Sequence, residues 1–569
     1  MEIEIKVDKE TVKRMYKPFI VTIFLIFSLI IFYNNLRVVL NYPIVFGDEG
    51  FHMKIAKEMT LRKEFIHFYY FFGPNHQASG YLTTFHFIEA FGFLISEYFA
   101  RFLLPFSIFL IAFSVFALFW KLFDEKIALL SAILVQVFQS TVIYSTTFYV
   151  DNLFLLYNFL AFSFLFIFAR EKNLRYLLLS SVFFSLLFFS KPMLNVVAAF
   201  SIFFLVLYYL YLKVINYKQL VLYFVFPLMF FSSIILMNVS IYNKICYNYW
   251  YISEIINKIL KLSGECIIRT TDYVDKYSYK DFSDVTERVG SEQTLFDFGL
   301  LNYISFAYGN SLFIVFTLFT SICYILFKMR RYDILFPSIP IISLTIVWLS
   351  TFYIFFGDLG IFGRTEDAAR YTYIFNPFLA LYISLFIYFI KDICNIFSRK
   401  IDFTLLFNLS FFVLVFFVIL IFYPLYSEKL EIMKRVKSFS SKFFEACDWV
   451  KNNINSTETL YSLWGQRVSY NCERKMVGVL DLRFSRNATE IYEISKKIGL
   501  NYFFIEKFSI DPLNRNFAEM YDLDWVKILL ENPQYFEKVY ENGVEINSCI
   551  NNYLPRGLVC DGVIILRVV

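Results

Sequence analysis

The chain has 569 residues, of which 58% are hydrophobic, 22% are aromatic and only 18% are charged, and its mean hydropathy is +0.56. Soluble globular chains are about half apolar and about a quarter charged, so this composition excludes a soluble protein and a disordered one. The net charge of +5 is small and its basic residues are spread over short loops, which excludes a polyanionic partner such as a nucleic acid.

Apolar runs of about twenty residues recur from residue 19 to residue 424, and each is long enough to cross a bilayer as a helix. The first run, 19–33, follows a basic tail and has no small-residue cleavage pattern after it. We therefore expect a retained helix with residues 1–17 in the cytoplasm. Further spans are predicted at about 102–120, 127–147, 152–169, 175–190, 196–212, 219–240, 301–327, 333–354, 371–390 and 403–424. The prediction is a polytopic α-helical membrane protein with about 11 to 13 spans.

The segment 80–99 is apolar enough to span, but it carries His86, Glu89 and Glu97. The positive-inside rule favours a helix along the membrane surface, because the short basic connectors downstream then share the side of the basic tail. On this topology the outer regions are residues 34–101, 243–300, 355–370 and everything after 424.

Residues 428–569 differ from the membrane module 18–427, because hydropathy falls, charge rises and no later run is long enough to span. Helical and strand patterns alternate there, which predicts an extracytoplasmic α/β domain.

Six of the eight cysteines fall in the predicted outer regions, where disulfides are permitted. Cys549 and Cys560 would close a short loop within one domain, and half-buried thiols are the alternative.

The sharpest polar motif is Phe46-Gly47-Asp48-Glu49-Gly50, directly after the first span. Asp48 could act as the general base of a sugar transfer, with Glu49 orienting the acceptor or a cation. The alternative is an acidic helix start. Asp151 begins a later span on the same predicted face, and an acid at the edge of a span is either solvated or functional.

All four histidines, His52, His67, His76 and His86, lie in the first outer region, and Glu89 follows His86 by about one helical turn. His52, His86 and Glu89 could therefore hold a metal. No paired CxxC or HExxH motif is present, so we expect that no cofactor is required. A divalent metal held by these residues is the alternative. Without a metal, the histidine side chains would lie at a wet, aromatic interface.

Three cations lie at predicted outer ends of spans: Lys191 in the segment FFSKPMLN, and Arg364 and Arg370 in FGRTEDAARYTYIFNP. Each could bind a donor phosphate, because arginine grips phosphate oxygens bidentately and lysine acts as a point charge. The alternative for each is anchoring at the membrane interface beside tyrosines.

The segments GDEG, GPNHQASGYL, YVDN, SKP and ARYTYIFNP, in this order, resemble the GT-C superfamily of integral-membrane glycosyltransferases. The nearest type is that of the protein O-mannosyltransferases and the lipid A aminoarabinose transferases. The resemblance implies that Asp48 is the catalytic base and Glu49 its partner, that Asp151 lines the same cavity, and that Lys191 and Arg370 face the lipid phosphate.

Two segments depart from the family pattern. Pro74-Asn75-His76 stands where relatives often have two prolines, and Leu463-Trp464-Gly465-Gln466-Arg467 stands where the oligosaccharyltransferase branch has WWDYG. The second departure argues against transfer of a preassembled oligosaccharide to asparagine.

The resemblance thus implies an inverting hexosyl or pentosyl transferase of the cell membrane. Its donor would be a polyprenyl-phosphate-linked sugar on the outer leaflet, such as a dolichyl-phosphate sugar, and its acceptor a protein, lipid or glycan of the cell envelope. The alternatives are an oligosaccharyltransferase-like enzyme and a transporter or assembly protein without transferase activity.

Overall fold

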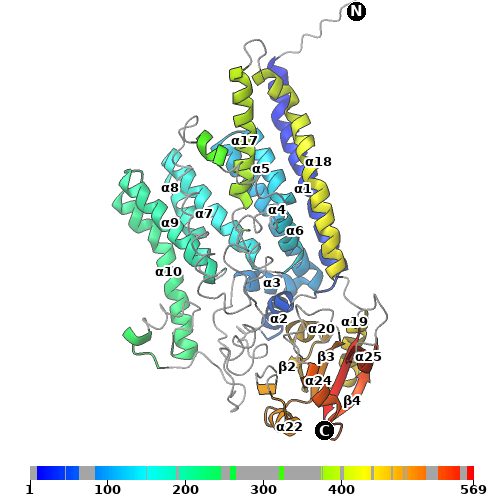
Figure 1. The fold of residues 1–569 in the computed structure, drawn as a ribbon. Coiled ribbons are helices and arrows are strands. Elements are labelled where there is room, and N and C mark those ends of the chain that lie inside the picture. Colours follow the sequence, from blue (N-terminus) through cyan, green and yellow to red (C-terminus); the bar gives the residue numbers. More distant parts are fainter. Residues whose placement is uncertain are drawn as a thin grey trace, which may run out of the picture.

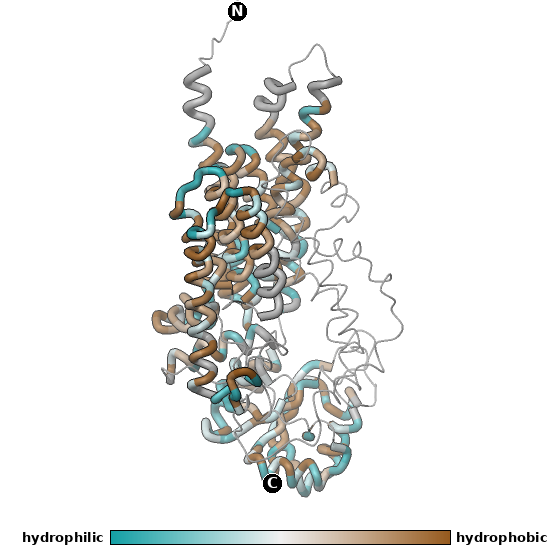
Figure 2. The backbone as a smooth tube through the Cα atoms, turned by 90° about the vertical axis from the view of Figure 1, so that its left-hand side faces the viewer, coloured by the Kyte–Doolittle hydropathy of each residue, from teal (hydrophilic) through white to brown (hydrophobic). Residues whose placement is uncertain are grey.

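The computed structural model describes residues 9–44, 47–62, 84–148, 150–187, 190, 192–244, 257–263, 319–325, 373, 376–397, 403–437, 441–462, 465–477, 481–482, 485–507, 523–550 and 560–569. A long helical bundle stands above a smaller part that contains a sheet and the C-terminus (Figure 1). Apolar residues cover most of the bundle's described length, whereas polar and apolar residues alternate in the sheet-containing part (Figure 2).

The bundle's helices occur where apolar runs predict spans. They are α1 (Lys9–Asn41), α4 (Glu97–Leu122), α5 (Glu125–Val137), α6 (Gln139–Thr146), α7 (Asp151–Glu171), α8 (Leu174–Leu187), α9 (Pro192–Tyr211), α10 (Tyr217–Tyr242), α17 (Asn376–Phe397) and α18 (Phe403–Lys437). Within the described residues, five helices are long and apolar enough to cross a membrane, or six if α5 and α6 form one span. The chain is an integral membrane protein, while most of 301–327 and all of 333–354 lie outside the described residues, so the total number of spans stays a prediction.

The predicted span 127–147 is broken in the structure into α5 and α6, which meet at an angle of 64°. Neither proline nor glycine is present at the break, and polar side chains form hydrogen bonds around it. Asn376 of α17 donates from Nδ2 to the hydroxyls of Ser140 (3.0 Å) and Thr141 (2.8 Å), and Thr141 donates to the Val135 carbonyl at 2.6 Å. A helix break is tolerated at membrane depth when such partners are available.

Two short helices lie at the lower end of the bundle in Figure 1, α2 (Gly47–Arg62) and α3 (Thr84–Ile95). With 12 residues, α3 is about 18 Å long, too short to cross a bilayer. Ser96 then caps α4 by accepting a hydrogen bond from the Phe99 amide. These bounds support the prediction of a surface helix within residues 80–99.

The exposed side chains of α3 are mostly apolar, and they include Phe87, Phe91, Leu94 and Ile95. Such a face suits the membrane interface. On its other side α3 approaches α4 closely, because a Cβ atom on Gly92 would lie 2.7 Å from the Cα atom of Ala100.

Residues 441–569 contain a five-stranded sheet in the order β2-β1-β3-β5-β4. Its strands are β1 (Thr459–Tyr461), β2 (Lys475–Met476), β3 (Tyr502–Glu506), β4 (Phe536–Glu541) and β5 (Val563–Val568). The first three strands are parallel, whereas β5 runs antiparallel to both β3 and β4. The helices are α19 (Ser441–Asn453), α20 (Gly465–Cys472), α22 (Ala488–Lys497), α24 (Leu523–Leu530) and α25 (Ile546–Ile550).

Hydrophobic clusters pack on both faces of this sheet, because neighbouring strand residues point to opposite sides. Phe503 and Ile564 belong to one cluster, and Phe504 and Ile565 to the other. An α/β unit with two covered faces follows.

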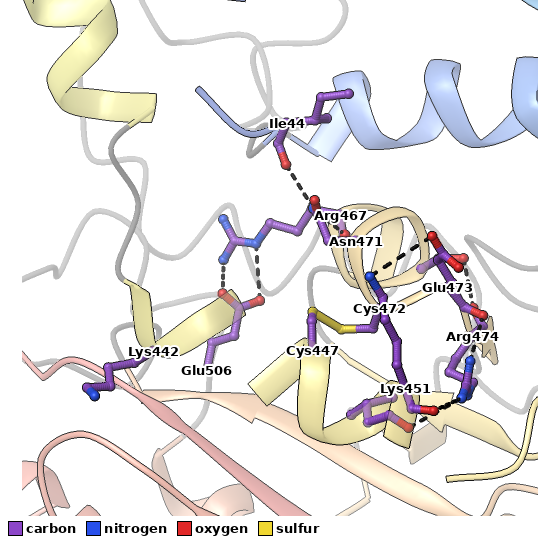
Figure 3. The surroundings of a disulfide bond; sticks show 12 residues. Ile44, Lys442, Cys447, Lys451, Arg467, Asn471, Cys472, Glu473, Arg474 and Glu506 are labelled. Carbon is purple, nitrogen blue, oxygen red and sulfur yellow. Dashed lines mark hydrogen bonds and ion pairs between the residues drawn. A yellow bond between two sulfur atoms is a disulfide. The ribbon is translucent and has the colours of Figure 1, made fainter. Parts of the chain in front are cut away.

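The predicted bridge between Cys549 and Cys560 is wrong, since neither takes part in a disulfide and both are buried thiols in one hydrophobic cluster. A disulfide instead joins Cys447 of α19 to Cys472 at the end of α20 (Figure 3). Their Cα atoms are 4.4 Å apart because the two helices pack against each other, although 25 residues separate them. Proximity along the chain therefore gave the wrong partner, as connectivity depends on the packing of distant elements.

Candidate active site

The acidic motif lies in the first turn of α2, which begins at Gly47. Glu49 therefore lies where the N-terminal end of the helix dipole favours negative charge. The structure describes the backbone of Asp48, whereas its side chain lies outside the described residues.

Glu49 is fully buried and forms an ion pair with Lys437, the last residue of α18. Its Oε1 atom accepts hydrogen bonds from Lys437 Nζ at 2.6 Å and from the Phe148 amide at 3.0 Å. The Lys437 side chain is only 1% exposed. Burial lowers the pKa of Lys437, and the nearby Glu49 carboxylate opposes that shift. Three elements, α2, α18 and the residues before α7, thus meet on one carboxylate.

Lys437 is the residue of this site that sequence reasoning misses. It stands 388 positions from Glu49 and ends a basic run with Lys434 and Arg435, which resembles ordinary interfacial anchoring. Its burial distinguishes Lys437 from an ordinary interfacial lysine, and the local sequence pattern does not show that burial.

Asp151 is the first residue of α7 and is fully buried. It follows Phe148, whose amide binds Glu49, by three residues, and its role in the site stays a prediction.

The predicted motifs YVDN and ARYTYIFNP meet directly. The Tyr373 hydroxyl donates to Asn152 Oδ1 at 2.8 Å, and Asn152 Nδ2 donates to the Tyr144 carbonyl at 2.7 Å. The rings of Tyr144 and Tyr373 lie 4.7 Å apart. A residue more than two hundred positions later in the chain therefore binds the start of α7.

Two of the three predicted metal ligands are brought together. His52 Nδ1 and His86 Nε2 lie 2.8 Å apart, and both rings are buried. Burial and the neighbouring His52 lower the pKa of His86 well below its ordinary range, so we expect His86 to be neutral.

Glu89 is also buried, and its Oε2 atom has no hydrogen-bond partner among the described residues. Burial raises the pKa of this carboxyl well above its ordinary value. A neutral carboxylic acid fits that environment.

The described residues do not fit a metal centre. No three His, Cys, Asp or Glu side chains among them are grouped to hold an ion. Two imidazole nitrogens on one tetrahedral zinc would be about 3.4 Å apart, given bonds of about 2.1 Å, whereas the His52–His86 spacing of 2.8 Å is that of a hydrogen bond. The side chains of Asp48, His67 and His76 lie outside the described residues.

The three predicted phosphate-binding cations, Lys191, Arg364 and Arg370, also lie outside the described residues, so their role stays a prediction.

No protein-family model matches the sequence, and no curated protein matches it. Solved structures do match. The oligosaccharyltransferase AglB of Archaeoglobus fulgidus, in complex with an inhibitory peptide and a dolichol-phosphate, is 12% identical with a TM-score of 0.56, over 91% of this chain and 73% of that chain. The oligosaccharyltransferase of the same organism in complex with Zn and sulfate is 14% identical with a TM-score of 0.54, over 90% and 71%.

A further match is ArnT of Cupriavidus metallidurans bound to undecaprenyl phosphate. It is 9% identical with a TM-score of 0.54, and the match covers 96% of this chain and 97% of that chain. At these identities the likeness concerns the fold alone, and it extends over nearly the whole chain. The chain therefore has the fold of these solved structures.

Proposed function

We propose that the chain is a membrane glycosyltransferase that moves a sugar from a polyprenyl-phosphate-linked donor to an acceptor on the extracytoplasmic side. One observation carries the proposal: the acidic start of α2 is held by the buried Lys437 and the Phe148 amide at one end of a GT-C-like bundle, with Asp151 nearby. The match to ArnT bound to undecaprenyl phosphate supports a donor of this lipid class.

Glu49 would have a structural role and Asp48 a catalytic one. Glu49 already binds Lys437 and a backbone amide, so its carboxylate fixes the helix start. Asp48, the neighbouring acid, would supply the base. Asp48 would accept the proton of the acceptor hydroxyl while that oxygen attacks the anomeric carbon, and the phosphate would leave with the electrons of the broken C–O bond. Attack opposite the leaving phosphate inverts the anomeric centre.

The leaving phosphate needs positive charge, which Lys191, Arg364 and Arg370 would supply. The prenyl tail would remain in the bilayer, because each buried CH₂ contributes about 0.8 kcal/mol.

Two features support an extracytoplasmic site. The basic N-terminal tail favours the cytoplasm, and α2, α3 and the sheet lie at the opposite end of the bundle (Figure 1). The Cys447–Cys472 disulfide belongs to the same end and suits an oxidising compartment.

An oligosaccharyltransferase-like enzyme is the second candidate, favoured by the AglB structures, whose fold this chain matches over about nine-tenths of its length. Opposing it, Trp464-Gly465-Gln466-Arg467 replaces the corresponding family motif. A divalent-metal requirement and an asparagine-linked product would identify this candidate.

The test is donor consumption by the purified protein in lipid, with radiolabelled polyprenyl-phosphate hexoses and pentoses and candidate acceptors. Asp48→Asn should lower the rate by at least about a hundredfold. Glu58→Gln is the matched control, because it also removes an acid from α2. Glu58 forms an ion pair with Lys54, one turn earlier in the same helix. Equal rates for Asp48→Asn and wild type would refute the base assignment. A wild-type protein inert toward every donor, with and without divalent metal, would refute the function.

A further inference from the structure

Helix α20 contacts the backbone just ahead of the acidic motif. Asn471 Nδ2 donates one hydrogen bond to the Ile44 carbonyl at 2.8 Å and another to the Arg467 carbonyl of its own helix at 2.9 Å (Figure 3). The amide has two hydrogens, so both are used. Ile44 lies four residues before Asp48, and this bond therefore fixes the chain where it enters α2.

The residues around Asn471 also reach the membrane module. The Tyr470 hydroxyl hydrogen-bonds with Glu97 at 3.0 Å, and Glu473 forms an ion pair with Lys57 of α2 at 3.3 Å. Lys57 in turn lies 5.6 Å from the centre of the Tyr470 ring. The end of α20 thus binds both α2 and α4.

The same turn is tied back to α19. Cys472 forms the disulfide with Cys447, and Arg474 donates to the carbonyls of Lys451 (2.9 Å) and Ile454 (2.7 Å) at the end of α19 (Figure 3). Between these residues Glu473 has a φ of 56°, a left-handed conformation that costs a non-glycine residue about 1 kcal/mol. Surrounding contacts must hold a residue in that conformation.

Residues on both sides of Asp48 in the chain are therefore bound by other elements. On one side Ile44 is bound by Asn471, and on the other Glu49 is bound by Lys437. Lys437 directly precedes the connection to α19, to which α20 is bonded. Residues 437–474 therefore hold both flanks of the proposed catalytic base.

We propose that the turn Tyr470–Arg474, held to α19 by the Cys447–Cys472 disulfide, positions the acidic start of α2, with Asn471 as a positioning residue. The C-terminal domain then completes the membrane site. The catalytic consequence rests on the proposed function, whereas the mechanical coupling to α2 does not.

The experiment compares Asn471→Ala with Asn532→Ala in the full chain in lipid. Asn532 is the matched control, since it lies just after α24 and its Nδ2 atom donates to the Ile528 carbonyl of that helix at 2.8 Å. Amide hydrogen exchange in residues 44–62 is read first, because it requires no turnover. We expect exchange there to become at least about tenfold faster in Asn471→Ala and in Cys447→Ser/Cys472→Ser, and to stay unchanged in Asn532→Ala.

Catalysis is read second. Asn471→Ala should lower kcat by about 10- to 100-fold while the KM for donor changes less than about twofold, as expected for misplacement of a reacting group. Asn471→Gln, which keeps the amide donor, should recover part of the loss, and Asn471→Asp should not. Unchanged exchange in residues 44–62 would overturn the proposal, and so would equally faster exchange throughout β3 and β5, which would mean general unfolding. If exchange responds but the wild type turns over no donor, the coupling stands and the proposed function fails.

Discussion

Breaking the Glu49–Lys437 pair should destabilise the protein much more than replacing both residues together. Both side chains are at most 1% exposed, and the Oε1–Nζ distance is 2.6 Å. Removal of one member of a buried pair leaves an uncompensated charge, which costs about 3–5 kcal/mol, whereas replacing both by neutral groups of similar volume is often close to neutral.

Lys437→Met should fall within that range, because it removes the cation that binds the buried Glu49 carboxylate at 2.6 Å. Glu49→Gln should likewise leave the buried Lys437 ammonium without its counter-charge.

The assay is a double-mutant cycle of thermal unfolding midpoints in lipid nanodiscs at pH 7. Lys437→Met and Glu49→Gln should each lower the midpoint, and the double variant should lie above Lys437→Met. Lys434→Met is the matched control, because Lys434 pairs with Glu431 on the partly exposed face of the same helix. Additive effects of the two substitutions would refute the reasoning.

Two further substitutions test the helix packing and the sheet. Gly92→Val should lower the midpoint strongly, because its Cβ would meet the Ala100 backbone at 2.7 Å; a midpoint within 1 °C of wild type, on the order of measurement error, would contradict this close approach. Burial raises the pKa of Glu541, but hydrogen bonds from Lys507 and Lys538 outweigh it and hold the pKa at about 2. Because that pKa is depressed, the ionised Glu541 stabilises the fold above about pH 4.3, and this stabilisation is lost as the pH falls towards 2. Glu541→Gln should therefore lower the unfolding midpoint at pH 7, and it should lower the midpoint progressively less between pH 4 and pH 3. Thermal scans of the full chain measure this.

The membrane helices were predictable because the bilayer imposes both a length and a hydropathy on each span. The runs at about 102–120 and 152–169 became α4 and α7. The break between α5 and α6 was not predictable, since it depends on Asn376, which stands more than two hundred residues later in the chain.

The site was predictable only where its residues form a local motif. Asp48 and Glu49 are adjacent and follow a span, and they do begin a helix. The cation that binds Glu49 was missed, and the predicted disulfide had the wrong partners. Both depend on contacts between elements that are far apart in sequence. Composition and periodicity report the environment of a segment and not its partner.

The position of α2 explains why these distant contacts are needed. Its sequence, GDEGFHMKIAKEMTLR, has no apolar run that could anchor it in a bilayer, and it lies at the end of the bundle where hydrophobic packing between spans ends. Buried residues of α2 such as Met53 pack against the core of the bundle, and polar bonds from other elements add to this packing. Lys437 supplies one from the last described helix of the bundle, and Asn471 and Glu473 supply others from the C-terminal domain. An acid pair can remain close to the bilayer and still keep a defined geometry only if such bonds come from the aqueous side, so we expect any variant that loosens α20 to disturb the acids before it disturbs the spans.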